Sequence, residues 1–573
     1  MQEKRGFPPT EGVTLSGVRP TGLGRGLYVD VTLEKLDERV PKVQCGTGSA
    51  PVNLSGKRTE TKKAPLPRPL GPAGGCFFRN VFGPWSVLPG LFFCSEKERD
   101  QIMLESLEAA LYPIVVNINT YLSSYILVFL LIGVGLFYSI RTRFVQVRCF
   151  GEGMRKVFGN LTLRGGKQEH GMSSFQALAT AIAAQVGTGN IVGGSGAILA
   201  GGPGAIFWMW VIAFFGMATI YAEATLAIET RQKDPDGSYR GGPVYYITTA
   251  FKGGFGKFLA GFFAVAIILA LGFMGCMVQS NSIGSTFQTA FGVPSWIVGI
   301  VLVVICGFIF VGGVQRLASV TEKIVPVMAA IFLGGALVVL VMRAKYIPDT
   351  IAMIFQYAFQ PQAIIGGGFG YALKEAISQG AKRGLFSNEA GMGSTPHAHA
   401  QANVTDPHDQ AVVAMVSVFI DTFVVLTLNA LVVISTLYTE GGPLANGYTG
   451  AVTETLSKTN LAQTAFGVVF GAEAGAMFVA VCLFFFAFST VLSWNLFGKI
   501  NAVYLFGKKA VPVYSVIALV FIFLGTVMSN DLVWELTDMF NNLMVIPNAI
   551  ALFALSNIVV RVADRKKAAG KKE

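Results

Sequence analysis

The sequence predicts an all-α polytopic membrane protein with about 11 transmembrane helices. Of its 573 residues, 52% are hydrophobic and 13% are charged, whereas roughly a quarter of the residues in a soluble globular domain carry charge. The mean hydropathy is +0.56. Apolar runs close to the roughly 20 residues that a bilayer requires recur along the chain, and short segments containing Lys and Arg separate them.

The net charge of +11 does not indicate nucleic-acid binding, because the basic residues lie in short segments between apolar runs. That distribution is typical of the cytoplasmic loops of membrane proteins. The seven cysteines are scattered without CxxC spacing, so the sequence predicts neither a disulfide framework nor a metal site built on cysteine. Membrane lipid is an expected partner, nucleic acid is not, and no oligomer is required.

The predicted spans and the loops between them set an orientation. The loop 141–170 carries seven Lys and Arg residues against two Glu, so the positive-inside rule places it in the cytoplasm. The N-terminus is then expected outside and the C-terminus inside. The spans are predicted at 121–140, 173–200, 204–228, 258–288, 294–312, 321–342, 364–396, 409–437, 466–494, 511–528 and 533–560.

Residues 1–102 differ from the rest of the chain. They are rich in Pro, Gly and charged residues and contain neither a span nor the apolar core of a signal peptide. The sequence predicts that they are disordered or only locally structured. Translocating such a segment without a signal is difficult, so we expect translation to start at Met103, and residues 103–573 to form the transmembrane domain.

A glycine-rich stretch, Gln185–Gly194, interrupts the predicted span 173–200. Each glycine inside a helix costs roughly 1 kcal/mol relative to alanine, so the stretch predicts local unwinding. The carbonyls on the Ala183–Val186 side would suit a cation, and the N–H groups on the Thr188–Asn190 side would suit a carboxylate. The alternative is an unbroken helix whose glycines allow close packing.

A second glycine-rich stretch lies about 200 residues later, in 366–370 and 380–394 of the predicted span 364–396. Paired interruptions at corresponding places in two halves are typical of transporters built from inverted repeats, whose site lies near the middle of the membrane. The sequence therefore predicts a five-plus-five inverted-repeat core with two discontinuous helices.

Other polar groups lie inside predicted spans. Ser489 and Thr490, with Trp494 one turn beyond, could complete a sodium shell and limit a cavity, or the hydroxyls could simply bond back to their own helix. The polar run 279–282 could line the cavity or join two helices. Glu389 and Asp421 could relay protons.

Two further groups of polar residues are not expected to form part of the site. Glu223 lies near the end of its predicted helix and is expected at the membrane interface. The His397 and His399 pair, with His408, could ligate a metal, but no cysteine is near them in the sequence, so we do not expect a metal site there.

Several long motifs in order resemble the alanine/glycine:cation symporter family. They are Gly171–Gly193, Gly202–Trp210, Tyr221–Ala227, Gly241–Tyr246 and Gly384–Ser394. The resemblance covers about 103–573 and implies eleven helices, of which the last ten form a leucine-transporter-like core. It also implies uptake of alanine or glycine with sodium, or less often with protons, across the plasma membrane, which is the inner membrane of a bacterium.

The resemblance implies a set of site residues. Those expected at the substrate carboxylate are Gly187, Thr188, Gly189 and Asn190. Those expected to hold sodium are the carbonyls of Ala183 and Val186 and the hydroxyls of Ser489 and Thr490. Those expected to shape the pocket are Gln279, Asn281, Phe386, Asn388 and Trp494. No organic cofactor is expected, and neither a channel filter nor an HExxH-type catalytic group is evident. A proton-coupled carrier and a carrier of a larger neutral amino acid remain as alternatives.

If translation starts at Met103, the native protein lacks residues 1–102. Its intact mass, measured by mass spectrometry after purification from its own organism, is then well below the 61.1 kDa of the full chain. A measured mass near 61.1 kDa would refute the Met103 start.

Overall fold

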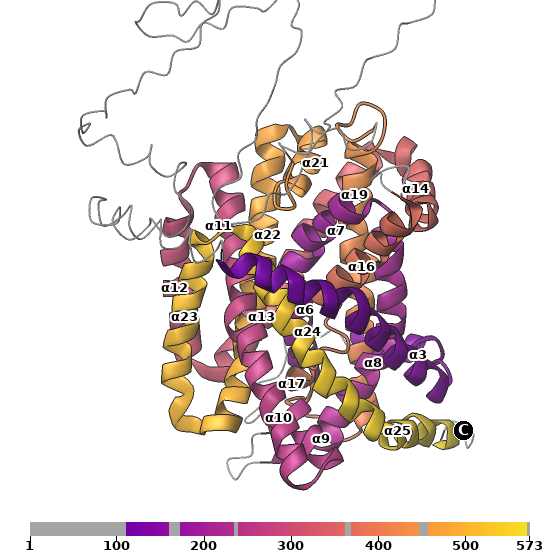
Figure 1. Cartoon of the computed structure of the whole chain (residues 1–573), viewed down its shortest axis with the longest axis vertical. Helices are drawn as coiled ribbons and strands as arrows, with labels where there is room; N and C mark the ends of the chain where they lie inside the picture. The colour runs from indigo at the N-terminus through magenta and orange to yellow at the C-terminus, as the bar shows by residue number, and fades with distance from the viewer. Residues whose placement is uncertain (1–109, 160–171, 234–238, 361–367, 446–455, 570–573) are drawn as a thin grey trace, which may run out of the picture. The chain divides into compact units, whose positions relative to one another are not determined.

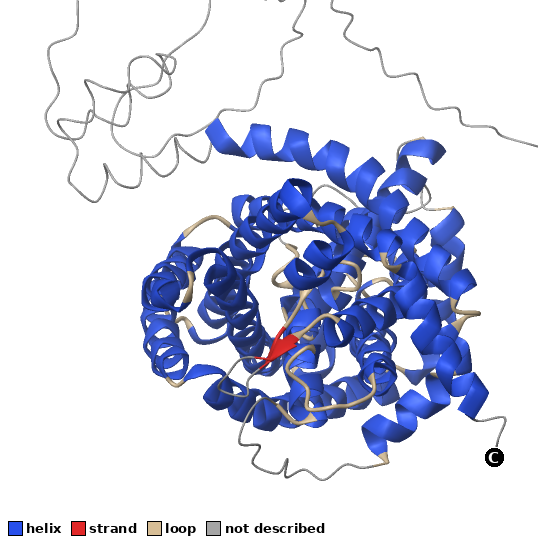
Figure 2. Cartoon of the chain, turned by 90° about the horizontal axis from the view of Figure 1, so that it is seen from below, coloured by secondary structure: helices blue, strands red, loops and turns tan. Residues whose placement is uncertain are grey.

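The computed structural model describes residues 110–159, 172–233, 239–360, 368–445 and 456–569, which are mostly helical (Figure 1). The segment 1–102 and residues 366–367 of the second glycine-rich stretch lie outside the described residues. Figure 2 shows helices throughout, with one small pair of strands. The strands β1 (Gln232–Lys233) and β2 (Tyr239–Arg240) pair antiparallel. A mostly helical fold is therefore confirmed for the described part of the chain, and the short strand pair is an addition to the predicted all-α class.

The described elements up to residue 342 are mostly helices. Residues 110–121 are also helical. The labelled elements are η4 (Leu122–Leu127), α3 (Val128–Arg141), α4 (Val145–Arg148), α5 (Phe150–Phe158), α6 (Ser174–Gln185), η5 (Gly189–Gly193), α7 (Gly194–Gly201), α8 (Ala205–Glu229), α9 (Pro243–Ala250), α10 (Gly253–Ile267), η6 (Ile268–Gly275), α11 (Cys276–Phe291), α12 (Ser295–Val311) and α13 (Gly313–Met342).

The remaining elements complete the described chain. They are η7 (Ala344–Tyr346), α14 (Ile347–Phe359), α16 (Phe369–Asn388), α17 (Pro396–His399), α18 (Pro407–Val418), η8 (Phe419–Leu426), α19 (Thr427–Leu437), α21 (Leu461–Phe470), α22 (Ala472–Phe506), η9 (Lys508–Ala510), α23 (Val511–Val527), α24 (Asn530–Ala554) and α25 (Ser556–Ala569).

Six helical stretches among the described residues are long and apolar enough to cross a membrane. They are Ala205–Glu229, Gly253–Phe291, Gly313–Met342, Pro407–Leu437, Ala472–Phe506 and Lys508–Val527. A seventh is α24 with α25, which meet at an angle of 59°. The helices α3, α12 and α21 are apolar but shorter than 18 residues. A multi-span membrane protein is thus supported, while the count of eleven stays a prediction.

The helix α16 occupies most of the predicted span 364–396 but carries charged side chains. Lys382 and Arg383 bond to Asp538 of α24 at 2.8 and 3.0 Å. All three side chains are largely buried, and a buried charge is tolerated only when it is paired. These ion pairs fix α16 against α24, which places the C-terminal end of α16 in the interior.

Two sets of helices surround that interior. The helices α6 and α11 pack along α22, and α16 and α18 pack along α8. The largest fully buried side chains include Trp494 and Phe486 of α22, Tyr221 of α8 and Trp534 of α24. The interior of the bundle thus lies between α22 and α8, where α6 and α16 end.

The short helix α17 follows α16 and is fully buried rather than part of an exposed loop. The ring of His397 stacks on Phe263 and Phe497, and its Nε2 lies 2.8 Å from the amide nitrogen of Asn501. His399 Nδ1 lies 3.0 Å from the amide nitrogen of Gln410. Because burial disfavours the charged imidazolium, it lowers the pKa of His397 to about 4 and that of His399 to about 3.

These two histidines make stability depend on pH. Their pKa values are lower in the folded state than in the unfolded chain, so between about pH 6.5 and pH 4 the unfolded state binds more protons. Each is expected to remove up to about 1.4 kcal/mol of stability per pH unit in this window. Thermal unfolding of the detergent-purified protein should therefore shift to lower temperature below pH 6.5. The shift should shrink in His399→Gln, and an unchanged pH profile in that variant would contradict the account.

Candidate functional site

The first predicted interruption is present. The helix α6 begins with a capping box, in which Ser173 Oγ accepts from the N–H of Gln176 and Gln176 Oε1 accepts from the N–H of Ser173, each at 3.1 Å. It ends at Gln185, and Val186 leaves the helical region with ψ 88°. The helix resumes as the π-helical turn η5 at Gly189. The break is thus confined to Val186–Thr188, and all of it is buried.

Side chains from other helices and from η5 form hydrogen bonds with backbone groups at the break. The N–H of Gly187 donates to Asn190 Oδ1 at 3.0 Å, and the N–H of Thr188 donates to Gln279 Oε1 at 3.1 Å. On the other side of the break, the Thr490 hydroxyl donates to the carbonyl of Ala183 at 2.7 Å. The two amides therefore have oxygen acceptors, and the carbonyl has a hydroxyl donor, within the protein.

The glycines of the break also allow close packing. A Cβ at Gly187 would lie 2.4 Å from Thr490 Oγ1, and a Cβ at Gly189 would lie 2.9 Å from the Cα of Ser387 and 3.2 Å from Phe386 Cδ1. Neighbouring helices thus approach the bare backbone directly. Unwinding and close packing, posed as alternatives from the sequence, occur together.

The second interruption is present but lies later than part of the prediction. The helix α16 continues through Gly380 and Gly384 to Asn388, so the expectation of unwinding at 380–384 is wrong. A Cβ at Gly380 would lie 2.6 Å from Trp208 Cβ, so this glycine serves close packing against α8. The chain leaves the helix only at residues with positive φ, which are Glu389 (57°), Gly391 (93°) and Gly393 (78°).

A buried carboxylate holds the second break. The side chain of Glu223 of α8 is fully buried inside the protein. It accepts hydrogen bonds from the N–H groups of Gly391 at 3.1 Å and Gly393 at 2.9 Å. Asn548 of α24 donates to the same carboxylate at 2.6 Å and to the carbonyl of Gly391 at 2.9 Å. An acid inside an apolar span was the available signal.

Direct hydrogen bonds join the two breaks. Gln185 Nε2 donates to the carbonyl of Asn388 at 2.8 Å. Asn190 Nδ2 donates to Asp421 Oδ1 at 2.6 Å, and Ser387 Oγ donates to Asp421 Oδ2 at 3.0 Å. Asp421, on the π-helical turn η8, therefore contacts residues from both interrupted helices. Ser387 is a contact that the sequence analysis missed.

Aromatic rings border the first break. Phe386 meets Trp494 edge to face at 5.6 Å and lies 4.8 Å from Trp534. The indole N–H of Trp494 donates to the carboxylate of Glu389. The structure thus brings Phe386 and Trp494 together, and it adds Trp534 of α24 to them.

Two of the predicted site residues form hydrogen bonds with other parts of the protein. Asn281 donates to the carbonyls of Gly525 and Met528 at 2.7 and 3.0 Å, so it joins α11 to the end of α23. Ser489 donates to the carbonyl of Phe486 at 2.9 Å, the same carbonyl that Thr490 reaches at 3.0 Å. Helix back-bonding therefore accounts for Ser489, whereas Thr490 additionally reaches the break.

Three buried polar atoms at the breaks have no hydrogen-bond partner among the described residues. They are Gln185 Oε1, Thr188 Oγ1 and Gln279 Nε2. Leaving such a group unpaired costs about 1–3 kcal/mol. One is an acceptor, one is a donor and the hydroxyl can be either. A ligand carrying both an ammonium and a carboxylate matches this set.

Comparison with known protein families gives a match over most of the chain. Residues 108–573 match the model of the sodium:alanine symporter family. The chain belongs to that family. It is 39% identical to the sodium/alanine symporter AgcS of Methanococcus maripaludis, over 78% of this chain and 94% of the relative.

Another relative is named for a different substrate. The chain is 37% identical to the probable sodium/glutamine symporter GlnT of Bacillus subtilis, over 79% of this chain and 91% of the relative. Among solved structures, MhsT in complex with L-phenylalanine is 14% identical with a TM-score of 0.48, covering 70% of this chain and 93% of that one. That likeness is too weak to support a conclusion about the fold. Membership therefore establishes a symporter family and leaves the amino acid open.

Gly189 and Gly194 should respond differently to alanine. Gly189→Ala drives a methyl group into the backbone of Ser387 and is expected to cost about 1–3 kcal/mol and to reduce substrate binding. At Gly194 the nearest atoms lie 3.7 Å away, so Gly194→Ala should be tolerated. Thermal stability and substrate binding of both purified variants test this. Equal behaviour of the two would contradict the close approach at Gly189.

Glu223→Gln should weaken the second break. One carboxylate oxygen becomes an NH₂ group that faces backbone N–H donors, at a cost of about 1–3 kcal/mol. The exposed Glu229 on the same helix supplies the control Glu229→Gln. We expect a lower unfolding temperature and less transport in Glu223→Gln alone. Wild-type values for both would show that the carboxylate does not hold the break.

Proposed function

We propose that this protein is a secondary active symporter that imports a small neutral amino acid, alanine or glycine, together with sodium. The observation that carries the proposal is the polarity of the first break. Its amide side meets the oxygen of Gln279, and its carbonyl side meets the hydroxyl of Thr490. A carboxylate and a hard cation would replace these protein partners within one short stretch of chain.

For sodium, we propose the carbonyls of Ala183 and Val186 with the hydroxyls of Ser489 and Thr490. Support comes from the 2.7 Å bond between Thr490 and the Ala183 carbonyl, which brings two of these oxygens together before any ion is considered. The carbonyl of Phe486 accepts from both hydroxyls and lies beside them. Such a set of neutral oxygens suits a hard cation.

For the amino acid, we propose that its carboxylate binds at Gly187, Thr188, Gly189 and Asn190. The oxygen of Gln279 stands at the Thr188 amide and would yield to the substrate. The side chain would face Phe386 and Trp494, and Phe386 lies close to Gly189. Two aromatic rings beside a bare backbone favour a small side chain. Asn388 would act through its carbonyl, which holds Gln185.

A larger amino acid is a second candidate, because the relative GlnT is named a probable sodium/glutamine symporter. Proton coupling is the alternative to sodium, with Glu389 or Asp421 as the carrier. Both carboxylates are buried and bonded to residues of the two breaks. No organic cofactor and no enzymatic step are needed for either reading.

The proposed architecture has eleven spans, ten of which form the five-plus-five inverted repeat in the inner membrane of a bacterium. The N-terminus would lie outside and the C-terminus in the cytoplasm. Two breaks, at Val186–Thr188 and at 389–395, joined by the bond from Gln185 to Asn388, support a repeat with its site between the halves.

Uptake into proteoliposomes tests the proposal. An inward sodium gradient should drive accumulation of radiolabelled alanine, and Thr490→Val should raise the half-saturating sodium concentration at least about tenfold, since one oxygen is lost. Thr225→Val is the control, because Thr225 is an equally buried threonine whose hydroxyl donates to the carbonyl of Tyr221 within α8. Competition by excess glycine or glutamine identifies the preferred side chain.

Two results would overturn the proposal. Uptake that is indifferent to collapsing both the sodium and the proton gradient would exclude symport. A Thr490→Val protein with the sodium dependence of Thr225→Val would remove the proposed sodium site.

A further inference from the structure

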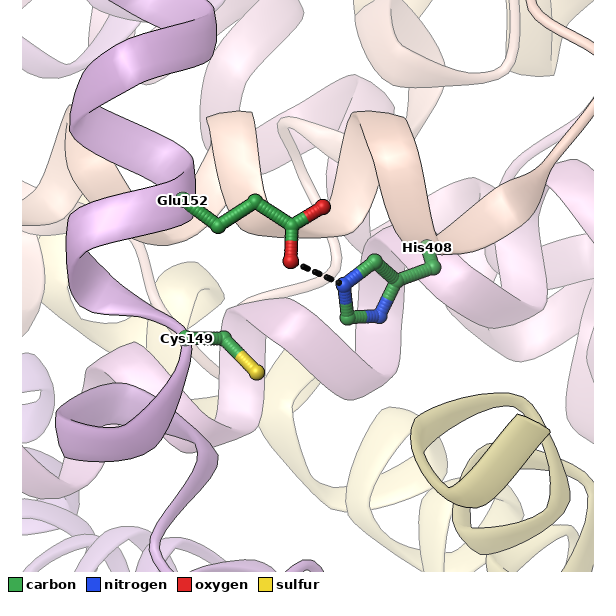
Figure 3. A group of neighbouring side chains, drawn as sticks. All are labelled: Cys149, Glu152 and His408. Atoms are coloured by element: carbon green, nitrogen blue, oxygen red, sulfur yellow. Dashed lines mark hydrogen bonds and ion pairs between the residues drawn. The ribbon is translucent and has the colours of Figure 1, made fainter. Parts of the chain in front are cut away.

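Three potential metal ligands gather away from both breaks. Cys149 directly precedes α5, Glu152 lies in the first turn of α5, and His408 is the second residue of α18 (Figure 3). The thiol, carboxylate and imidazole atoms all lie within 4.8 Å of one another. Figure 3 shows the three side chains pointing toward one another from two separate helices.

The spacing on α5 follows from helix geometry. Residues three apart lie on one face, so Cys149 and Glu152 present the sulfur and the carboxylate to the same side. His408 comes from a helix 256 positions later in the chain than Glu152, and its Nε2 lies 3.3 Å from Glu152 Oε2. That distance is already close to the roughly 3.5 Å that separates two ligands on a tetrahedral zinc ion.

The surroundings orient His408 for coordination. Its Nδ1 lies 2.7 Å from the hydroxyl of Tyr221 on α8, which would hold the proton on Nδ1 and leave Nε2 for a metal. Its backbone N–H donates to Asp406 Oδ1 at 3.0 Å, which fixes the start of α18. A ligand held both at its ring and at its backbone does not need to be reorganised when an ion binds.

We propose that Cys149, Glu152 and His408 bind one zinc ion, with water at a fourth position. Sulfur, nitrogen and oxygen ligands in this combination suit zinc, and sodium, as a hard cation, does not use thiolate or imidazole. The site is thus separate from the co-transported ion. Its three protein ligands leave the fourth position open to water.

The charges around the cluster are compatible with a bound cation. Glu152 Oε1 lies 3.8 Å from Lys156, but the ammonium is nearer to Asp409, at 2.8 Å. Cys149 and His408 are buried, whereas Glu152 is only partly buried. Glu152 can therefore turn its side chain to bring the three ligand atoms the remaining distance together.

A bound ion would fasten α5 to α18, and through Tyr221 to α8. These helices lead into the residues that hold the breaks, since η8 with Asp421 continues α18, and Glu223 lies two residues beyond Tyr221. Zinc is then expected to raise the unfolding temperature of the protein, because it binds the folded chain across two helices.

Metal titration of the full-length protein in detergent tests the site. With cobalt as the probe, we expect one equivalent to bind, with near-ultraviolet absorption from the thiolate that added zinc removes. Cys149→Ser should abolish that absorption, while Cys306→Ser, at a buried cysteine of α12, should retain it. Tyr221→Phe should weaken zinc binding about 10–100-fold, as loss of a partner behind a ligand does.

Glu152→Gln is a second variant that should fold normally, because this side chain is partly exposed and the replacement has the same shape. It should lower zinc affinity at least tenfold and remove the zinc-induced rise in unfolding temperature. Wild-type zinc affinity in Cys149→Ser and Glu152→Gln, or no thiolate absorption in the wild-type cobalt complex, would overturn the proposal.

Discussion

The absence of hydrogen-bonding partners in the hydrocarbon core of a membrane constrains every other feature of this structure. A helix that unwinds inside a bilayer releases N–H and C=O groups that lipid cannot satisfy. Here the partners come from side chains: Gln279 and Thr490 serve the first break, and Glu223 serves the second. These polar residues lie in apolar spans because the backbone groups at the two breaks need hydrogen-bond partners.

The same bonds couple the two breaks. Gln185 at the end of α6 holds the last carbonyl of α16, and Asp421 holds both Asn190 and Ser387. A ligand that displaces Gln279 from the Thr188 amide changes one member of a continuous hydrogen-bonded set. The two breaks are therefore joined through named hydrogen bonds as well as through packing.

The first break could be predicted from the sequence because its cause is local, in glycines and a Thr-Gly-Asn run at 187–190. The second break was predicted partly in the wrong place, because the sequence does not show which structural role a glycine has. Gly380 allows α16 to pack closely against Trp208, whereas Gly391 and Gly393 adopt positive φ. The partners that hold the breaks lie far away in the chain, and periodicity does not reveal which side chains meet.

Orientation on a helix explains the remaining differences. Asn281 shares a polar run with Gln279, yet two residues along a helix turn it by more than half a revolution, toward α23 instead of the break. The sequence groups His408 with His397 and His399, but its neighbours in space include Cys149 and Glu152.

An experimental structure with sodium and alanine bound tests the central claim most directly. It should show the alanine carboxylate at the amides of Thr188 and Gly189, and an ion between Thr490 Oγ1 and the carbonyls of Ala183 and Val186. Alanine and sodium located away from residues 183–190 would contradict it.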